Sequence, residues 1–164
     1  MSTTKTIVTK DVTAKKITVS REFDAPVSLV WRAYTDSEIL DQWWGPSPWK
    51  AKTKSMDFRE GGQWLYVMTG PDKEEHWSLM QYIKINTEKD FSANDAFCDE
   101  NGNINTDMPG SKWFNRFIKT NNGTEVVAEL SFETKEQMDE LIKMGFEEGF
   151  KQGLEQLQAL LPKL

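Results

Sequence analysis

The chain has very little of what catalytic and metal-binding sites usually require. Its 164 residues include one cysteine, Cys98, and one histidine, His76. A single cysteine excludes an internal disulfide framework and is typical of a reducing compartment. One histidine and one cysteine are too few for a usual closed zinc site, and a histidine-activated nucleophile would depend on His76 alone. We therefore expect no metal, no cofactor and no histidine-based catalytic group.

Long apolar runs and an excess of basic charge are also missing. No stretch approaches the roughly 20 apolar residues that a membrane-spanning helix needs, and residues 1–13 lack the apolar core of a secretion signal. The 20 basic and 26 acidic residues give a net charge of −6, which argues against binding to the phosphate backbone of nucleic acids. The expectation is a cytoplasmic protein with no membrane span and no nucleic-acid partner, either a monomer or a homodimer.

Large aromatic side chains, in contrast, are abundant. Seven tryptophans and nine phenylalanines in a chain of this length predict a bulky apolar interior, either a solid core or a ligand site. The length suits one domain. Because residues 1–13 are polar and unpatterned, we expect them to form a flexible tail and residues 14–164 to form a single domain.

Most of the chain reads as strands joined by short turns. Residues 16–23 alternate as a half-buried strand. Asp24 is placed to cap a first helix, and a second short helix is expected from Asp36 to about Trp43. Further strands are expected at 51–58, 62–69, 76–86, 89–98, 112–119 and 124–133. Consecutive strands of this kind predict an antiparallel meander in an α+β domain, with a long loop at 99–110.

The last element predicted is a long helix. Thr134 and Gln137 match a capping box, and the helical pattern then runs to about Leu161, a length of roughly 40 Å. Glycines recur along one ridge of this helix, at Gly145, Gly149 and Gly153. Each is expected to cost about 1 kcal/mol relative to alanine in a helix interior. Either close packing against the sheet or space for a ligand would explain them, and both explanations stay open.

Several short segments together resemble a known superfamily. They are Arg21–Pro26, Val30–Trp31, Trp43–Pro46, Asp57–Trp64, Met68–Asp72 and the glycine ridge with Phe150 and the leucines that follow. In their order and spacing they resemble the SRPBCC (START-like) superfamily, and within it the bacterial branch related to the activator of the ninety-kilodalton heat-shock-protein ATPase. The resemblance covers residues 14–161.

This resemblance implies a helix-grip fold with a cavity. In that fold, a curved antiparallel sheet of six to seven strands wraps around a long C-terminal helix, and two short helices follow the first strand. Relatives hold apolar molecules between the helix and the sheet. Met80 stands where the family often has glycine, so it is expected to fill part of the space. The residues expected to line the cavity are Trp44, Trp64, Tyr66, Met68, Met80, Tyr82, Gly145, Phe146, Gly149 and Phe150.

The function predicted from these residues is non-catalytic binding of a small hydrophobic or amphipathic ligand. Two alternatives stay open. One is a co-chaperone-like domain that contacts a chaperone, which the resemblance alone suggests. The other is an enzyme of the cyclase or dehydratase type. Such an enzyme needs an acid or base inside the cavity, for which Arg21, Arg116 and Tyr82 are candidates if they point inward.

Overall fold

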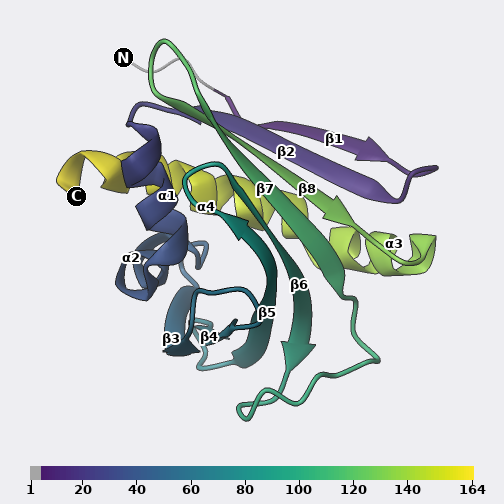
Figure 1. Cartoon of the computed structure of the whole chain (residues 1–164). Helices are drawn as coiled ribbons and strands as arrows, with labels where there is room; N and C mark the ends of the chain where they lie inside the picture. The colour runs from purple at the N-terminus through teal and green to yellow at the C-terminus, as the bar shows by residue number, and fades with distance from the viewer. Residues whose placement is uncertain (1–4) are drawn as a thin grey trace.

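One antiparallel sheet organises residues 5–164, the part of the chain that this computed structural model describes (Figure 1). Within those residues the sheet has eight strands in the order β1-β2-β8-β7-β6-β5-β4-β3. The bounds are β1 Ile7–Asp11, β2 Lys16–Phe23, β3 Lys50–Met56, β4 Gln63–Thr69, β5 Glu75–Asn86, β6 Asp90–Cys98, β7 Ser111–Lys119 and β8 Thr124–Ser131. The expected antiparallel arrangement is therefore present, with more strands than the six to seven expected.

The additional strand, β1, lies inside the range expected to be a flexible tail. It pairs with β2 from Ile7 opposite Ser20 to Asp11 opposite Lys16. Four of its five residues are exposed, so it lacks the alternation of apolar and polar residues that reveals a strand. Backbone hydrogen bonds to the free edge of β2 hold it instead. Residues 1–4 of the predicted tail lie outside the described part of the chain.

Two short helices follow β2, as expected. They are α1 (Val27–Thr35) and α2 (Ser37–Trp43). The Asp36 carboxylate caps α2 by accepting a hydrogen bond from the N–H of Glu38 at 3.0 Å. The expectation that Asp24 caps α1 was wrong, because Pro26 occupies the N-cap position and no side chain caps that helix.

The C-terminal helix is two helices rather than one. α3 (Lys135–Lys143) begins at the predicted cap, where Thr134 Oγ1 accepts from the N–H of Gln137 at 3.1 Å. At Gly145 the backbone takes φ = 86°, which ends α3 and starts α4 (Phe146–Leu160), followed by a short 3₁₀ turn, η1 (Leu161–Lys163). A positive φ favours glycine because it has no Cβ to clash. The helical periodicity continues across this break, so the sequence pattern merged the two helices.

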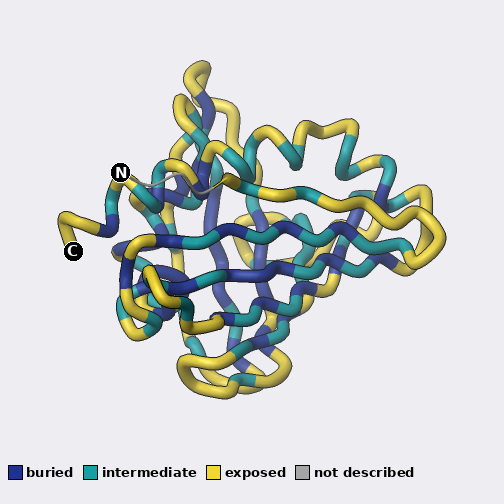
Figure 2. The backbone as a smooth tube through the Cα atoms, turned by 90° about the horizontal axis from the view of Figure 1, so that it is seen from above, coloured by how far each residue is buried: buried dark blue, intermediate teal, exposed yellow. Residues whose placement is uncertain are grey.

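The core lies between the concave face of the sheet and the helices. Figure 1 shows α4 running across the sheet, with α1 and α2 at the end near the chain's C-terminus. Leu154 and Leu157 of α4 are buried between the helix and the sheet. On the sheet side, every second residue of β2 and β8 is buried. Figure 2 shows the same distribution, with buried backbone along the central strands and exposed backbone at the hairpin turns.

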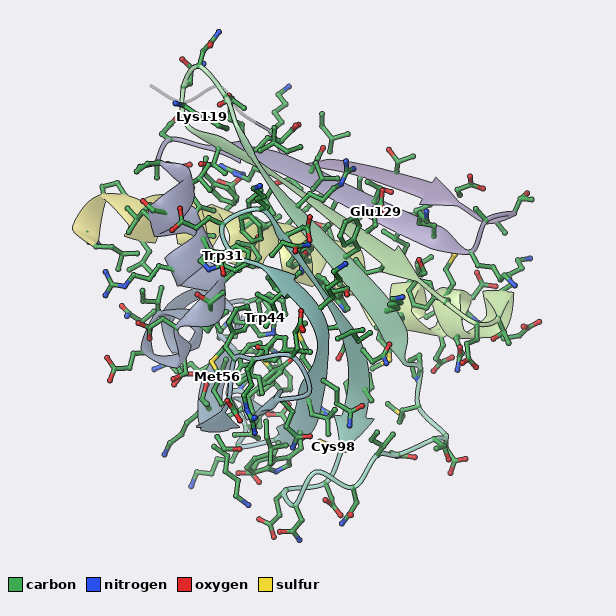
Figure 3. The ribbon with its side chains drawn as sticks, viewed as in Figure 1. Trp31, Trp44, Met56, Cys98, Lys119 and Glu129 are labelled. Carbon is green, nitrogen blue, oxygen red and sulfur yellow. The ribbon has the colours of Figure 1, made fainter. Side chains whose placement is uncertain are left out.

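Side-chain hydrogen bonds of Asp99 hold the first turn of the predicted loop at 99–110. Asp99 accepts hydrogen bonds from the backbone N–H groups of Asn101 and Asn103, each at 2.9 Å. An isolated bridge joins Cys98 to Ile104. This loop lies at the end of β6 marked by Cys98 in Figure 3, so it extends the sheet at the end away from α1. Its hydrogen bonds agree with the turn chemistry expected of an Asp- and Asn-rich segment.

Candidate ligand-binding site

A pocket of about 230 Å³ opens between the concave face of strands β4 to β7 and the α3–α4 junction. The segment after α2 closes one side of it. Its lining consists of Trp44, Pro46, Tyr66, Met68, His76, Ser78, Asp95, Phe97, Trp113, Leu141, Met144, Gly145, Phe146, Gly149 and Phe150. The wall is thus mostly aromatic and apolar with a small polar group, which is the usual constitution of a small-molecule site.

Two larger hollows elsewhere have a different character. One of about 540 Å³ lies where the turn after Lys119 meets the start of α1, and Figure 3 marks Lys119 beside it. The other, of about 600 Å³, lies beside the segment 104–112. The first is lined mainly by exposed residues. The second is lined mainly by polar side chains and shares Asp95 with the aromatic pocket. The aromatic pocket is the candidate site.

Four aromatic rings build the apolar wall of the pocket. The Trp44 ring lies 5.8 Å from the rings of Trp113 and Phe150, measured between centroids. Phe150 lies 5.3 Å from Trp113 and stacks on Phe146 at 5.4 Å. In Figure 3 the labelled Trp44 lies among the side chains enclosed by the curved sheet and the helices. Because each ring packs edge-on or stacked against the next, the wall is held rigidly in place.

Polar groups gather on the sheet side of the pocket. The Trp44 indole N–H donates to the Tyr66 hydroxyl at 3.0 Å, and Ser78 lies opposite Tyr66 in the β4–β5 register. Ser78 in turn lies opposite Phe97 of β6. Burial and the nearby Asp95 carboxylate raise the pKa of Tyr66, so its hydroxyl stays neutral over the whole physiological range. Tyr66 therefore acts as a neutral hydrogen-bonding group.

Asp95 is the titratable group with the most distinctive environment in the pocket. Its side chain is half-buried on the inward face of β6, and burial raises the pKa of its carboxyl from 3.8 to about 6. Hydrogen bonds from the Trp113 indole N–H, at 3.1 Å, and from Ser111 act in the opposite direction and limit the rise. A carboxyl with this pKa in a cleft is a candidate functional group, because it changes charge near neutral pH.

Comparison with known proteins places the chain in a family. Residues 24–162 match the model of the family described as activator of Hsp90 ATPase homolog 1-like protein. The chain belongs to this family. No protein with a curated description matches the chain.

Solved structures of bacterial proteins share the fold of this family member over nearly the whole chain. Protein Ms6760 from Mycobacterium smegmatis is 33% identical, with a TM-score of 0.88, and the match covers 94% of this chain and 95% of that protein. A protein from Arthrobacter aurescens is also 33% identical, with a TM-score of 0.90 over 96% and 92% of the two chains. Protein NE0264 from Nitrosomonas europaea is 28% identical, with a TM-score of 0.80 over 92% and 96%.

The structure of this Hsp90-activator-like chain brings most of the predicted cavity residues together. Those in the lining are Trp44, Tyr66, Met68, Gly145, Phe146, Gly149 and Phe150. Trp64, Met80 and Tyr82 lie instead in the adjoining core, outside the lining. Trp64 donates its indole N–H to Thr53 Oγ1 at 2.9 Å, and Tyr82 packs on Phe58 with ring centroids 4.7 Å apart. The inward face of β4 and β5 is thus divided between a filled core and an open pocket.

The three glycines of the predicted ridge have three different roles. Gly145 forms the break between α3 and α4. Gly153 allows close packing, because a Cβ there would lie 3.3 Å from the carbonyl oxygen of Trp43. Gly149 lines the pocket, and a Cβ there would meet nothing closer than Pro46 Cγ at 3.6 Å. Both explanations proposed for the ridge therefore apply, but at different glycines.

The groups suggested as inward-facing catalytic candidates do not line the pocket. Arg21 is buried, but its guanidinium pairs with Glu155 of α4. Arg116 pairs with Glu129 of β8 at 3.5 Å, and Figure 3 shows Glu129 at the sheet region remote from Trp44. Burial raises the pKa of the Cys98 thiol and the neighbouring Asp99 raises it further, so the reactive thiolate is disfavoured.

Sequence reasoning missed the polar side of the pocket. Asp95, Ser78 and His76 were not expected there, nor were the aromatic residues Phe97 and Trp113. A signal for Asp95 exists, because β6 alternates as Phe91, Ala93 and Asp95, which puts a carboxylate on an otherwise apolar face. His76 is exposed at the rim, with its ring 5.4 Å from that of Trp49.

Residues 5–164 contain neither a metal-binding cluster nor a membrane-spanning helix. Within residues 5–164, no three His, Cys, Asp or Glu side chains are grouped so as to hold a metal ion. No helix in that part of the chain is both long enough and apolar enough to span a membrane. The pocket residues themselves offer one carboxylate, one imidazole and hydroxyl groups, a set suited to hydrogen bonding rather than to closed metal coordination.

Proposed function

We propose that this chain is a non-catalytic binding protein for a small amphipathic molecule held between the sheet and the α3–α4 junction. The observation that carries the proposal is the aromatic pocket of about 230 Å³ with hydrogen-bonding groups confined to its sheet side. A ligand with one apolar end and one polar end matches that division. Burying an apolar group against these rings provides affinity, and the polar groups fix its orientation.

The size of the pocket restricts the ligand. Drug-sized ligands occupy clefts of about 300–1,000 Å³, and this pocket is smaller at about 230 Å³. We therefore expect a molecule with one ring or a short chain, rather than a complete lipid or a steroid. Met144 and His76 are exposed at the rim, so a longer ligand would project past them into solvent.

The test is binding of small aromatic probes to the full chain. 2-Phenylethanol is expected to raise the melting temperature and to quench or shift tryptophan emission, because Trp44 and Trp113 line the pocket. Gly149→Leu is expected to fill the pocket and abolish both effects. Glu148→Leu is the matched control, since it adds the same side chain at an exposed position one residue away. Equal binding by both variants would contradict the proposed site, and no binding by the unmodified chain would contradict the function.

A second candidate function is general acid–base catalysis, and Asp95 is the observation that favours it. A carboxyl with a pKa of about 6 can donate or accept a proton near neutral pH. The pocket offers no Lys, Arg or Cys beside it among the described lining residues. Incubation of the chain with a β-hydroxyketone, followed by mass spectrometry for loss of water, tests this role. Dehydration that disappears in Asp95→Asn would favour the enzyme over the binding protein.

A further inference from the structure

The pocket contains a carboxylate that lacks a cationic partner in the protein. Within residues 5–164, none of the salt bridges involves Asp95. Its neighbours Trp113 and Ser111 supply neutral hydrogen bonds only. Charges withdrawn from water are normally paired, because desolvation of an isolated ion is expensive. Arg21, the buried charge elsewhere in this fold, follows that rule through Glu155. Asp95 does not.

The rings around the pocket can supply the other half of a cation site. Trp44, Trp113 and Phe150 pack on one another with centroids 5.3–5.8 Å apart, and all three line the pocket. Aromatic faces attract cations within about 6 Å, and tryptophan does so most strongly. Asp95 is joined to this group directly, because the Trp113 indole N–H is its hydrogen-bond donor. The carboxylate and the rings therefore face a common volume.

Other ionisable groups near Asp95 do not compensate its charge. They are Tyr66 of β4, His76 of β5, Cys98 of β6, Lys112 of β7 and Glu133 before α3. The hydroxyl of Tyr66 stays neutral, as does the thiol of Cys98. Lys112 is exposed on the opposite face of β7 from Trp113. His76 is the one imidazole among the residues that line this pocket, and it lies at the rim.

We propose that the ligand carries an ammonium group, held between the Asp95 carboxylate and the rings of Trp44, Trp113 and Phe150. This inference rests on the proposed binding function and narrows its ligand to small amines with an apolar substituent. The ammonium supplies the missing counter-charge, and the apolar part lies along Phe146 and Gly149. Neutral ligands of the same shape gain the aromatic contacts but leave Asp95 unpaired.

The proposal predicts competition between the ligand and protons. Since the pKa of Asp95 is about 6, the carboxylate is mostly ionised at pH 7.5 and mostly protonated at pH 5. An amine that needs the ionised form should bind about tenfold more weakly at pH 5. Because His76 also lines the pocket, the measurement is repeated in His76→Gln. The pH dependence is expected to persist there.

The decisive experiment compares three probes of similar size by isothermal titration calorimetry at pH 7.5. 2-Phenylethylamine is cationic, 2-phenylethanol is neutral and 3-phenylpropanoate is anionic. The amine is expected to bind at least tenfold more tightly than the alcohol, and the anion more weakly than both. Asp95→Asn is expected to lose at least tenfold in amine affinity while alcohol binding changes less than twofold. The asparagine side chain retains an oxygen that can accept the hydrogen bond from the Trp113 indole N–H. Glu100→Gln is the control variant, because it makes the same change in net charge at an exposed site.

The outcomes separate this inference from the proposed function. Alcohol binding as tight as amine binding, or undiminished amine binding by Asp95→Asn, overturns the ammonium site but leaves a binding protein. Failure of all three probes to bind overturns both. If Asp95→Asn does not fold, the pH series on the unmodified chain decides, because amine affinity that is constant between pH 5 and 7.5 contradicts the role of Asp95.

Discussion

Replacement of Gly149 by alanine should make the protein more stable and a weaker binder. A Cβ at Gly149 would meet Pro46 Cγ at 3.6 Å, an ordinary van der Waals contact, so the methyl group fits without movement. Gly149 lies within α4 and has a helical φ, and replacing a helical glycine by alanine gains about 0.5–1 kcal/mol. For a chain of this size, that corresponds to a rise in Tm of roughly 1–4 °C.

Urea denaturation measures this change, and Gly153→Ala serves as the comparison. At Gly153 the Cβ would lie 3.3 Å from the Trp43 carbonyl oxygen, so the same gain in helix propensity is offset by crowding against backbone. Gly149→Ala is thus expected to have the higher urea midpoint of the two, with the slope unchanged, and a reduced affinity for 2-phenylethanol. The reasoning is refuted if Gly149→Ala lowers the free energy of unfolding by more than about 0.5 kcal/mol, because Gly149 would then be serving close packing.

Three further changes test other parts of the structure. Gly145→Ala should lower the free energy of unfolding by about 1–2 kcal/mol, because alanine disfavours the positive φ at this position. Gly145→Asn should lower it by less, because asparagine adopts a positive φ more readily, and urea denaturation of both variants measures the difference. The free energy of unfolding should decrease as the pH rises from 4 to 6. The cause is Asp95, whose pKa is higher in the folded than in the unfolded chain, so that ionisation disfavours the folded state. The loss, up to about 3 kcal/mol at roughly 1.4 kcal/mol per pKa unit, should be absent in Asp95→Asn. Glu155→Ala should destabilise by about 1–2 kcal/mol because it leaves the Arg21 charge buried and unpaired, while Glu148→Ala should change thermal stability little.

The sequence could predict those elements whose local signals agree with the tertiary structure. The cap at Thr134 and the start of α2 near Asp36 were found because both side chains bond to backbone within the same turn. The one strand whose sequence carries no periodic signal was missed. β1 is held by the edge of β2 rather than by an apolar face of its own, so no periodicity reveals it. The end of α3 was missed for another reason, since the φ of Gly145 follows from how α3 and α4 pack and not from spacing.

The sequence predicted some of the residues that line the candidate site and missed others, for a similar reason. Alternation along a strand tells which face a residue occupies, but not how far along that face the core ends. Tyr66 and Trp64 share the inward face of β4, yet only Tyr66 reaches the pocket. The boundary depends on which side chains cover the face from across the fold, such as Phe58 over Tyr82. Such contacts join residues distant in sequence, so they become visible only once the chain is folded.

Gly149 and Asp95 are two unfavourable features without compensation within the described residues, and both belong to the same pocket. Gly149 weakens its helix although a methyl group would fit in its place, and Asp95 withdraws a carboxylate from water with no cation beside it. A comparable glycine and a comparable charge elsewhere are compensated: Gly153 by the close approach of Trp43, and Arg21 by Glu155. Local departures from the rules of stability tend to concentrate at functional sites. Since Gly149 leaves space and Asp95 leaves charge, one molecule that is both apolar and cationic would compensate the two together.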